Sequence, residues 1–116
     1  MAEFHKIAAA DDLAAGEVRQ YLVEDRPVAL CNVDGELHAF EDICTHQYTH
    51  LTEGELSGSE ITCPLHGAKF DVRTGAARSL PAVKPVPKHE LKVEGGYVYV
   101  ALNPQRVKVG RRRGRR

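Results

Sequence analysis

Two short segments of the sequence pair a cysteine with a histidine: CTH at 44–46 and CPLH at 63–66. Thiolates and imidazoles are ligands for both iron and zinc. In a 2Fe-2S cluster, two cysteines can hold one iron while two histidines hold the other, and the neutral imidazoles raise the reduction potential because they remove negative charge. The pattern therefore predicts one such cluster, with both loops contributing to both irons, on Cys44, His46, Cys63 and His66.

A four-ligand zinc site could use the same residue types. The usual zinc finger places its two cysteines together and its two histidines together on a helix, whereas here they alternate, which favours the cluster. His50 is a rival to His46, but it lies outside the close spacing and is expected to be a solvated loop residue. Cys31 lies in an apolar run, where a thiol usually packs as a small buried hydrophobe. Three other histidines have no neighbouring metal ligand and are expected at the surface: His5, His38 and His89.

Short apolar and β-branched runs alternate with turn residues along the chain, which is the pattern of an all-β sandwich or barrel. No long helical period competes, although residues 11–15 could form one helical turn. Asp34-Gly35 and Gly95-Gly96 each separate two such runs and favour tight hairpin turns, because these residues tolerate positive backbone angles. Strands are expected at 4–8, 17–23, 28–33, 37–40, 60–63, 69–72, 91–93 and 97–102.

Two segments between these strands, residues 42–58 and 63–68, are rich in Cys, His, Gly and Thr. They have little strand character and contain both cysteine–histidine pairs, so they are the expected functional loops. Residues 81–88 contain three prolines, which cannot supply a regular ladder of hydrogen bonds. This stretch is expected as an extended connection across one face.

The two loops resemble the cluster loops of the Rieske ferredoxins that serve aromatic-ring-hydroxylating dioxygenases. The similarity covers about residues 3–102 and rests on EDICTHQYTHLTEGEL at 41–56 and ITCPLHGAKFDVRTG at 61–75. Leu80-Pro81-Ala82 stands where the family has a proline-containing third loop. The resemblance implies an all-β Rieske iron–sulfur fold: two antiparallel sheets in a sandwich, with a small cluster-binding subdomain inserted at about 42–82.

The resemblance also suggests which residues surround the cluster. The amide of Gly67, directly after a ligand, is placed to donate to cluster sulfur. Ala68 and Phe70 stand where high-potential members of the family carry hydroxyl groups, and the extra disulfide of those members is missing. These differences predict a potential near the low end of the Rieske range, about −150 mV. Leu65 and Pro81 are expected to shield the cluster from water and to form a docking spot.

The function implied by the resemblance is that of a one-electron carrier in aromatic hydrocarbon catabolism. Such a ferredoxin is not an enzyme, and it passes electrons from a flavin-containing, NADH-dependent reductase to a terminal Rieske oxygenase. One alternative within the same architecture is the small Rieske subunit of a nitrite reductase. An alternative from another class is a zinc-stabilised binding module.

Charge is distributed unevenly although the formal net charge is zero. Seven of the sixteen basic residues lie at 106–116, whereas residues 1–105 hold nine basic and all sixteen acidic residues. The negative charge of residues 1–105 favours basic partner surfaces and argues against nucleic acid as a partner. Residues 103–116 are expected to form a disordered basic tail after a single domain at 1–102.

The cysteine content bears on the compartment. Three cysteines at uneven spacing fit metal binding in a reducing compartment better than they fit a disulfide scaffold. The chain has neither a run of 18 apolar residues nor a signal-like start. It is therefore expected to be cytoplasmic and to have no contact with a membrane.

Overall fold

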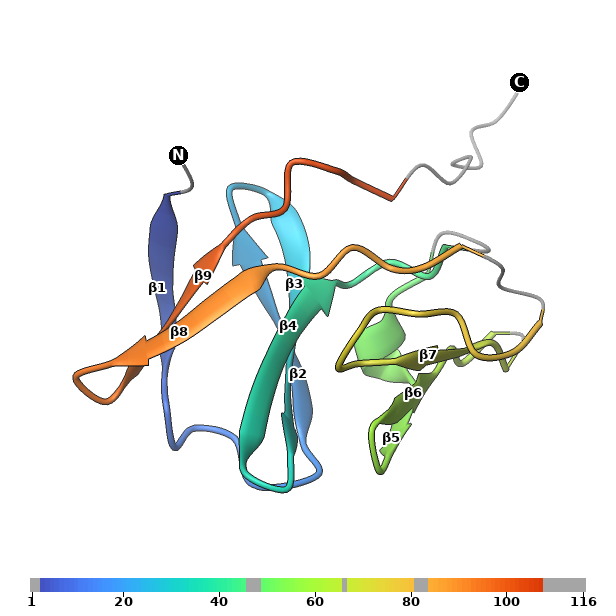
Figure 1. Ribbon diagram of the computed structural model, residues 1–116, viewed down its shortest axis with the longest axis horizontal. Coiled ribbons are helices and arrows are strands. Elements are labelled where there is room, and N and C mark those ends of the chain that lie inside the picture. Colours follow the sequence, from blue (N-terminus) through green and yellow to red (C-terminus); the bar gives the residue numbers. More distant parts are fainter. Residues whose placement is uncertain (1–2, 46–48, 66, 81–83, 108–116) are drawn as a thin grey trace.

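The computed structural model describes residues 3–45, 49–65, 67–80 and 84–107. Within these ranges the chain forms nine strands and one short 3-10 helix, η1. The strands make three antiparallel sheets of three strands each, two larger ones and a small one that lies to their right in Figure 1. The elements are β1 (Phe4–Ala9), β2 (Val18–Val23), β3 (Arg26–Val33), β4 (Glu36–Glu41), η1 (Leu51–Glu53), β5 (Glu55–Ser57), β6 (Glu60–Thr62), β7 (Lys69–Asp71), β8 (Glu90–Glu94) and β9 (Tyr97–Ala101).

The central sheet has the strand order β2-β3-β4, and two tight turns join its strands. Asp34 and Gly35 have positive φ angles of 52° and 92°, which confirms the hairpin predicted for this pair. Glu24 and Asp25 make the other turn, also at positive φ, 52° and 66°. That turn was not predicted, because Glu-Asp lacks the glycine that marks such turns in a sequence.

Strand β3 is buried on both faces, and its side chains alternate between two apolar clusters. Successive side chains of a strand point to opposite faces, so Val28 and Leu30 pack in one cluster while Ala29 and Cys31 pack in the other. The first cluster fills the space toward the sheet β1-β9-β8, where it meets the side chains of β9. The second cluster faces the small sheet.

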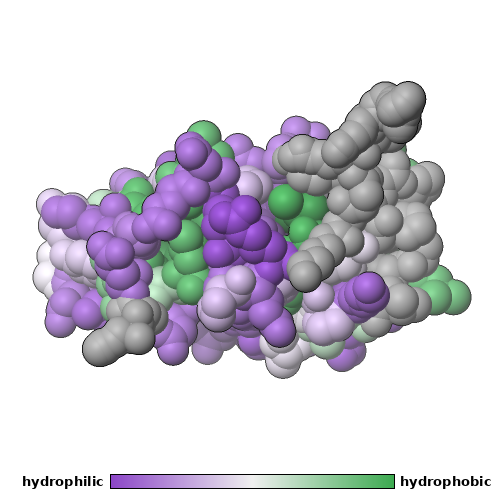
Figure 2. All heavy atoms as spheres, turned by 90° about the horizontal axis from the view of Figure 1, so that it is seen from above, coloured by the Kyte–Doolittle hydropathy of each residue, from purple (hydrophilic) through white to green (hydrophobic). Residues whose placement is uncertain are grey.

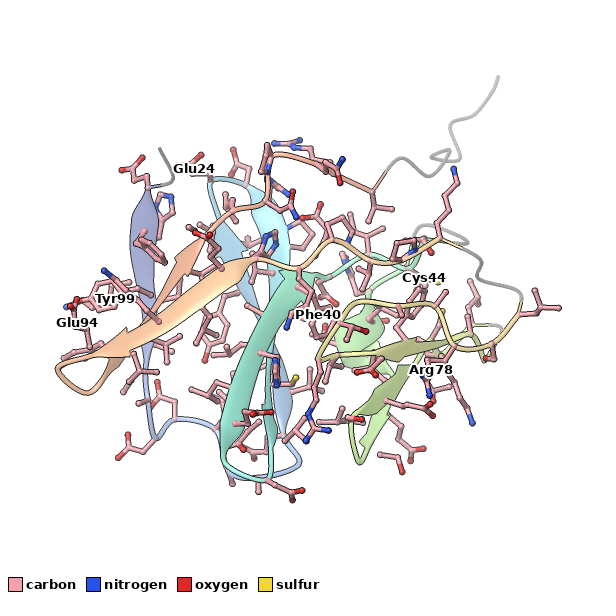
Figure 3. The ribbon with its side chains drawn as sticks, viewed as in Figure 1. Glu24, Phe40, Cys44, Arg78, Glu94 and Tyr99 are labelled. Carbon is pink, nitrogen blue, oxygen red and sulfur yellow. The ribbon has the colours of Figure 1, made fainter. Side chains whose placement is uncertain are left out.

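The small sheet, β5-β6-β7, belongs to the predicted subdomain and follows the first loop. Its Ile61 and Phe70 are opposite each other across β6 and β7 and share the second apolar cluster with Phe40 of β4. Figure 3 shows Phe40 between the central sheet and the subdomain. After β7 the chain runs around the subdomain and returns to β8, as Figure 1 shows. The shared cluster therefore packs the subdomain against the central sheet.

The structure differs from the sequence predictions in two places. Residues 51–57 form η1 and β5, although the segment 42–58 was expected to be loop. Residues 11–15 form turns and bends rather than a helical turn. Within the described ranges no helix is long and apolar enough to cross a membrane.

Candidate iron–sulfur site

Cys44 lies in the loop that follows β4, and its side chain is fully buried. Its backbone amide donates a hydrogen bond to the carbonyl of Thr49 at 2.9 Å, which closes the loop at 44–49. Figure 3 shows Cys44 on the subdomain side of Phe40. His46 lies outside the described residues, so its predicted role as a ligand stays a prediction.

Cys63 comes directly after β6, at the start of the second loop. Its amide donates to the carbonyl of Ala68 at 2.7 Å, and the amide of Gly67 donates back to the carbonyl of Cys63 at 3.1 Å. Gly67 has a φ of +76°, which favours glycine, so a tight backbone turn holds Cys63 in place. In this structure the Gly67 amide serves that turn, and its donation to cluster sulfur stays a prediction. His66 lies outside the described residues.

Both cysteines belong to the same buried apolar cluster, together with Leu51, Ile61 and Phe70. All three cysteines of the chain are thiols rather than disulfide sulfurs. Two loops thus deliver thiols into one water-poor environment. These donors fit a 2Fe-2S cluster, because thiolates are ligands for its iron and an apolar shell limits access of water.

Asp42, two residues before Cys44, anchors the first loop and was missed by the sequence analysis. Its carboxylate accepts hydrogen bonds from the Gln20 side-chain amide at 2.7 Å, from the Thr52 amide at 2.7 Å and from the Thr52 hydroxyl at 2.6 Å. Burial raises the pKa of the Asp42 carboxyl, although the Thr52 and Gln20 hydrogen bonds oppose that shift. The loop is therefore tied to both β2 and η1.

His50 is directed at the same anchor. Its Nδ1 donates to the Asp42 carbonyl at 2.9 Å and lies 3.7 Å from the Asp42 carboxylate. The imidazole is thereby engaged in holding the loop, a role that the sequence did not suggest for this residue.

Gly54 sets how closely the two loops approach. A Cβ atom at this position would overlap the carbonyl oxygen of Thr62 and contact Pro64, which flank Cys63. Only glycine allows the chain after η1 to pass this close to the second loop. The sequence offered no signal for this contact, because a lone glycine in a loop is common.

The residues predicted to surround the cluster are distributed as follows. Ala68 and Phe70 are fully buried, and Phe70 lies in the apolar cluster with both cysteines. Leu65 is 49% exposed, so the second loop carries an apolar side chain at the surface. Pro81 lies outside the described residues, so its shielding role stays a prediction.

The segment after the third loop is tied to the first cluster loop, to the turn after β7 and to the end of β4. The Thr45 hydroxyl donates to the carbonyl of Lys84 at 2.8 Å, and the amide of Val86 donates to the carbonyl of Gly75 at 2.8 Å. The amide of Glu41 donates to the carbonyl of Pro87 at 2.9 Å. Residues 84–87 thus form an extended connection, as predicted for the proline-rich stretch.

A buried ion pair lies at the end of β4, where the first loop begins. The Arg26 guanidinium donates to the Glu41 carboxylate at 2.7 Å, and both side chains are almost fully buried. Burial alone would raise the pKa of Glu41, but the nearby His89 imidazole and the hydrogen-bonded Arg26 guanidinium outweigh it and hold the pKa below its usual value. Glu41 therefore stays ionised at neutral pH.

The expectation that His89 lies at the surface was wrong. His89 is buried because residues 103–105 fold back over it: the Asn103 amide donates to its Nδ1 at 2.9 Å, and its Nε2 lies 3.5 Å from the Glu41 carboxylate. Arg26 also donates to the carbonyls of Asn103 and Gln105. The chain is therefore held well beyond the boundary predicted at residue 102, as far as Val107, which packs on the second apolar cluster.

Cys31 lies outside the two cluster loops, in the middle of β3. Burial raises the pKa of its thiol to about 12, despite the opposing effects of the nearby Lys88 charge and a hydrogen bond from the His38 backbone. The Lys88 ammonium in turn donates to His38 Nδ1 and to the carbonyl of Arg73, both at 3.0 Å. Cys31 therefore stays protonated, which agrees with its predicted structural role.

Comparison with known proteins agrees with this arrangement. Residues 3–90 match the Rieske 2Fe-2S domain family. The ferredoxin component of biphenyl 2,3-dioxygenase from Rhodococcus jostii (strain RHA1) is 43% identical over 97 residues, which cover 84% of this chain and 91% of that protein. The ferredoxin component of the naphthalene 1,2-dioxygenase system from Pseudomonas putida is 37% identical over 95 residues, covering 82% and 91%.

Solved structures show the same fold. The ferredoxin of carbazole 1,9a-dioxygenase from Nocardioides aromaticivorans IC177 superposes with a TM-score of 0.83 at 33% identity, covering 88% of this chain and all of that one. A chain in a complex of reduced oxygenase and oxidised ferredoxin in carbazole 1,9a-dioxygenase gives a TM-score of 0.80 at 40% identity, covering 84% and 92%. The chain belongs to the Rieske 2Fe-2S domain family and is a ferredoxin, an electron-transfer component with one 2Fe-2S cluster as its cofactor.

Proposed function

We propose that Cys44, His46, Cys63 and His66 hold the cluster and that the chain carries single electrons to the terminal oxygenase of an aromatic-ring dioxygenase system. The observation that carries this proposal is the similarity, over 91% of its length, to the ferredoxin component of a biphenyl dioxygenase. The placement of Cys44 and Cys63 in two loops that backbone hydrogen bonds close supports the ligand assignment. The electron donor is a flavin-containing, NADH-dependent reductase, and the site of action is the reducing cytoplasm.

The polypeptide contributes positioning and protection to this function. When bound, the cluster supplies the one-electron chemistry. The loop at 44–49 and the turn at 63–67 fix the two thiols, and Asp42 anchors the first loop. Leu51, Ile61 and Phe70 exclude water from the thiols. Leu65, which is half exposed and directly precedes His66 in the sequence, is proposed together with Pro81 to shield the cluster and to contact the partner.

The relatives named above favour a dioxygenase ferredoxin over the small subunit of a nitrite reductase, since each of them is a dioxygenase component. The solved complex of oxygenase and ferredoxin in carbazole 1,9a-dioxygenase points to an oxygenase as the electron acceptor.

The experiment is a stopped-flow transfer assay. The holoprotein is reduced under argon and mixed with the oxidised oxygenase of the Rhodococcus jostii biphenyl system, and the visible spectrum follows reoxidation of the ferredoxin. We expect reoxidation that is matched by reduction of the oxygenase, and none with apoprotein. If reduced holoprotein never transfers electrons to this or other aromatic-ring oxygenases, the proposed function is wrong.

A further inference from the structure

Residues 103–107 follow the last strand, β9, and run along the top of the molecule toward the cluster-binding subdomain, in red in Figure 1. Figure 2 looks onto this upper face, which is mostly hydrophilic with apolar patches between. Four hydrogen bonds tie the segment to the fold: from Arg26 to the carbonyls of Asn103 and Gln105, from the Asn103 side chain to the carbonyl of Lys88, and from the Asn103 amide to His89. Polar contacts therefore hold most of this segment in place.

One of these four bonds has a titratable acceptor. The Asn103 amide donates to His89 Nδ1 at 2.9 Å. A backbone N–H only donates, so Nδ1 must keep a free lone pair and the ring proton must lie on Nε2. The bond therefore exists only while the imidazole is neutral.

Two charged groups face this buried imidazole from the neighbouring strands. Nε2 lies 3.5 Å from Oε1 of Glu41 on β4, and the same oxygen accepts from Arg26 on β3 at 2.7 Å. The Glu41 charge favours a second proton on the ring, and the Arg26 charge opposes it. Lys88, the preceding residue, directs its ammonium to His38 instead. Among the described residues Nε2 has no hydrogen-bond partner, so it is free to form a closer contact with Glu41.

A second proton changes the contacts on both sides of the ring. Nδ1 becomes a donor that meets the Asn103 donor, and a buried donor without an acceptor is unfavourable. Nε2 gains an ion pair with Glu41, whose carboxylate is ionised because its pKa lies below the usual value. The imidazolium is thereby held in the core, while the Asn103 amide finds a new acceptor only in water.

We propose that residues 103–107 form a proton-sensitive latch, which neutral His89 holds and protonated His89 releases. The released state binds one proton more than the latched state, so a fall in pH favours release. The inference goes beyond the proposed carrier function, because it concerns contacts within the chain alone.

The latch lies beside the first cluster loop. Residues 104–107 line a groove together with Thr45, which directly follows Cys44. Val107 packs on the apolar cluster that contains Cys44 and Cys63. Release therefore opens the groove and removes an apolar cover from the cluster around both thiols.

The test is hydrogen exchange of the full-length holoprotein, measured by mass spectrometry on peptic fragments that contain residues 103–107. Exchange rates are corrected for their intrinsic pH dependence. Protection should fall about threefold to tenfold between about pH 7.5 and about pH 5.5, where imidazoles titrate, because one hydrogen bond contributes a factor of this order. In His89→Gln the side-chain oxygen accepts from the Asn103 amide without titrating, so protection should be equal at both pH values. His5→Gln, on β1 beside Glu24, should lose protection as the wild type does.

An unchanged protection of the wild type over this range would overturn the latch, as would an equal loss in His89→Gln. If His89→Gln does not fold, a pair of variants at Asn103 replaces it. Asn103→Pro removes the amide donor and Asn103→Ala keeps it, while both lose the side-chain hydrogen bonds. The acid-induced loss of protection at residues 105–107 should persist in Asn103→Ala and vanish in Asn103→Pro. A loss in both variants, or in neither, would also overturn the proposal.

Discussion

The three cysteines are all buried, but their surroundings differ in ways that bear on metal binding. Cys44 and Cys63 lie in loops that backbone hydrogen bonds close within a few residues, whereas Cys31 lies in the middle of a strand. The Cys31 thiol stays protonated because burial raises its pKa to about 12. Burial alone therefore does not distinguish a ligand from a structural cysteine.

Cys63→Ser is expected to abolish assembly of a stable cluster, because one iron loses a thiolate ligand. Cys31→Ala is the matched control, and it should retain the full cluster at a cost of about 1 kcal/mol in stability for the lost packing. Iron and sulfide analysis, together with the visible spectrum of anaerobically purified protein, shows whether each variant holds the cluster. A normal spectrum in Cys63→Ser would show that the ligand assignment is wrong.

Ala68→Ser is expected to raise the reduction potential, provided that its hydroxyl donates to cluster sulfur. Cluster sulfur becomes more negative on reduction, so a donor stabilises the reduced state more than the oxidised one. We take about half of the free energy of a hydrogen bond to a charged group as the difference between the reduced and the oxidised state. The reduction potential should then rise by an amount on the order of 30–60 mV. Ala76→Ser, two residues beyond the turn that follows β7, is the control and should leave the potential unchanged. Protein-film voltammetry measures the potentials of both variants. If the hydroxyl introduced by Ala68→Ser is bonded to cluster sulfur and the potential does not rise, the lack of a hydroxyl donor does not explain a low potential.

The two loops could be singled out from the sequence, because Cys and His at close spacing have few other uses, and the structure brings Cys44 and Cys63 of these loops into one buried cluster. The residues that position them could not. Asp42 is an ordinary acidic residue in sequence, and only the fold shows that Gln20 and Thr52 bond to it. His89 was expected at the surface because nothing local indicates that residues 103–105 cover it.

At the scale of elements, the strands that alternate strictly or flank a glycine turn were predicted to within two residues, whereas short β5 was missed. A three-residue strand has too few positions for a period-2 pattern, and β5 exists because β6 pairs with it. Contacts between distant loops, such as that of Gly75 with Val86, were equally invisible to local patterns.

Gly75→Ala is expected to destabilise the protein by several kcal/mol. Gly75 has a φ of +84°, and an added Cβ would overlap the Val86 carbonyl oxygen, so the change adds a clash to backbone strain. Gly58→Ala shares the positive φ, +59°, but its Cβ would meet nothing within 4 Å, so it should cost only about 1–2 kcal/mol. Urea unfolding of the holoproteins measures the difference. If Gly75→Ala and Gly58→Ala lost the same unfolding free energy, the close contact between Gly75 and Val86 would not stabilise the protein.

Glu41→Gln is expected to cost about 3–5 kcal/mol near neutral pH, because it leaves the buried Arg26 charge without its partner. Glu60→Gln breaks the exposed pair with Arg78 and should cost less than about 1 kcal/mol. Because the folded pKa of Glu41 is lowered, its contribution is fully present above the ordinary value of 4.5. The difference between wild type and Glu41→Gln should shrink as pH falls through the lowered pKa. Urea titrations at several pH values test this. If the difference in unfolding free energy between wild type and Glu41→Gln grew on acidification, the pKa of Glu41 would not be lowered in the folded protein.

At the scale of the whole molecule, the zero net charge conceals an acidic pair of sheets, a balanced subdomain and a basic C-terminal end. Residues 1–105 are acidic as a whole, but eleven of their sixteen acidic residues belong to 1–41 and 89–105, which form the two larger sheets, whereas residues 42–88 hold five acidic and five basic residues. The structure also holds residues 103–107 against the rest of the fold, so the basic end begins beside the first loop. Which charges share a face depends on the three-dimensional path of the chain and could not be predicted from the sequence.

The central claim is that this chain carries one Rieske 2Fe-2S cluster. Electron paramagnetic resonance of the dithionite-reduced protein, with iron and sulfide analysis of the same sample, tests it most directly. We predict a red-brown protein with two irons and two sulfides per chain and a paramagnetic signal that appears only on reduction, with nitrogen hyperfine coupling from two imidazoles. A colourless protein that holds one zinc ion and gives no signal on reduction would contradict the account.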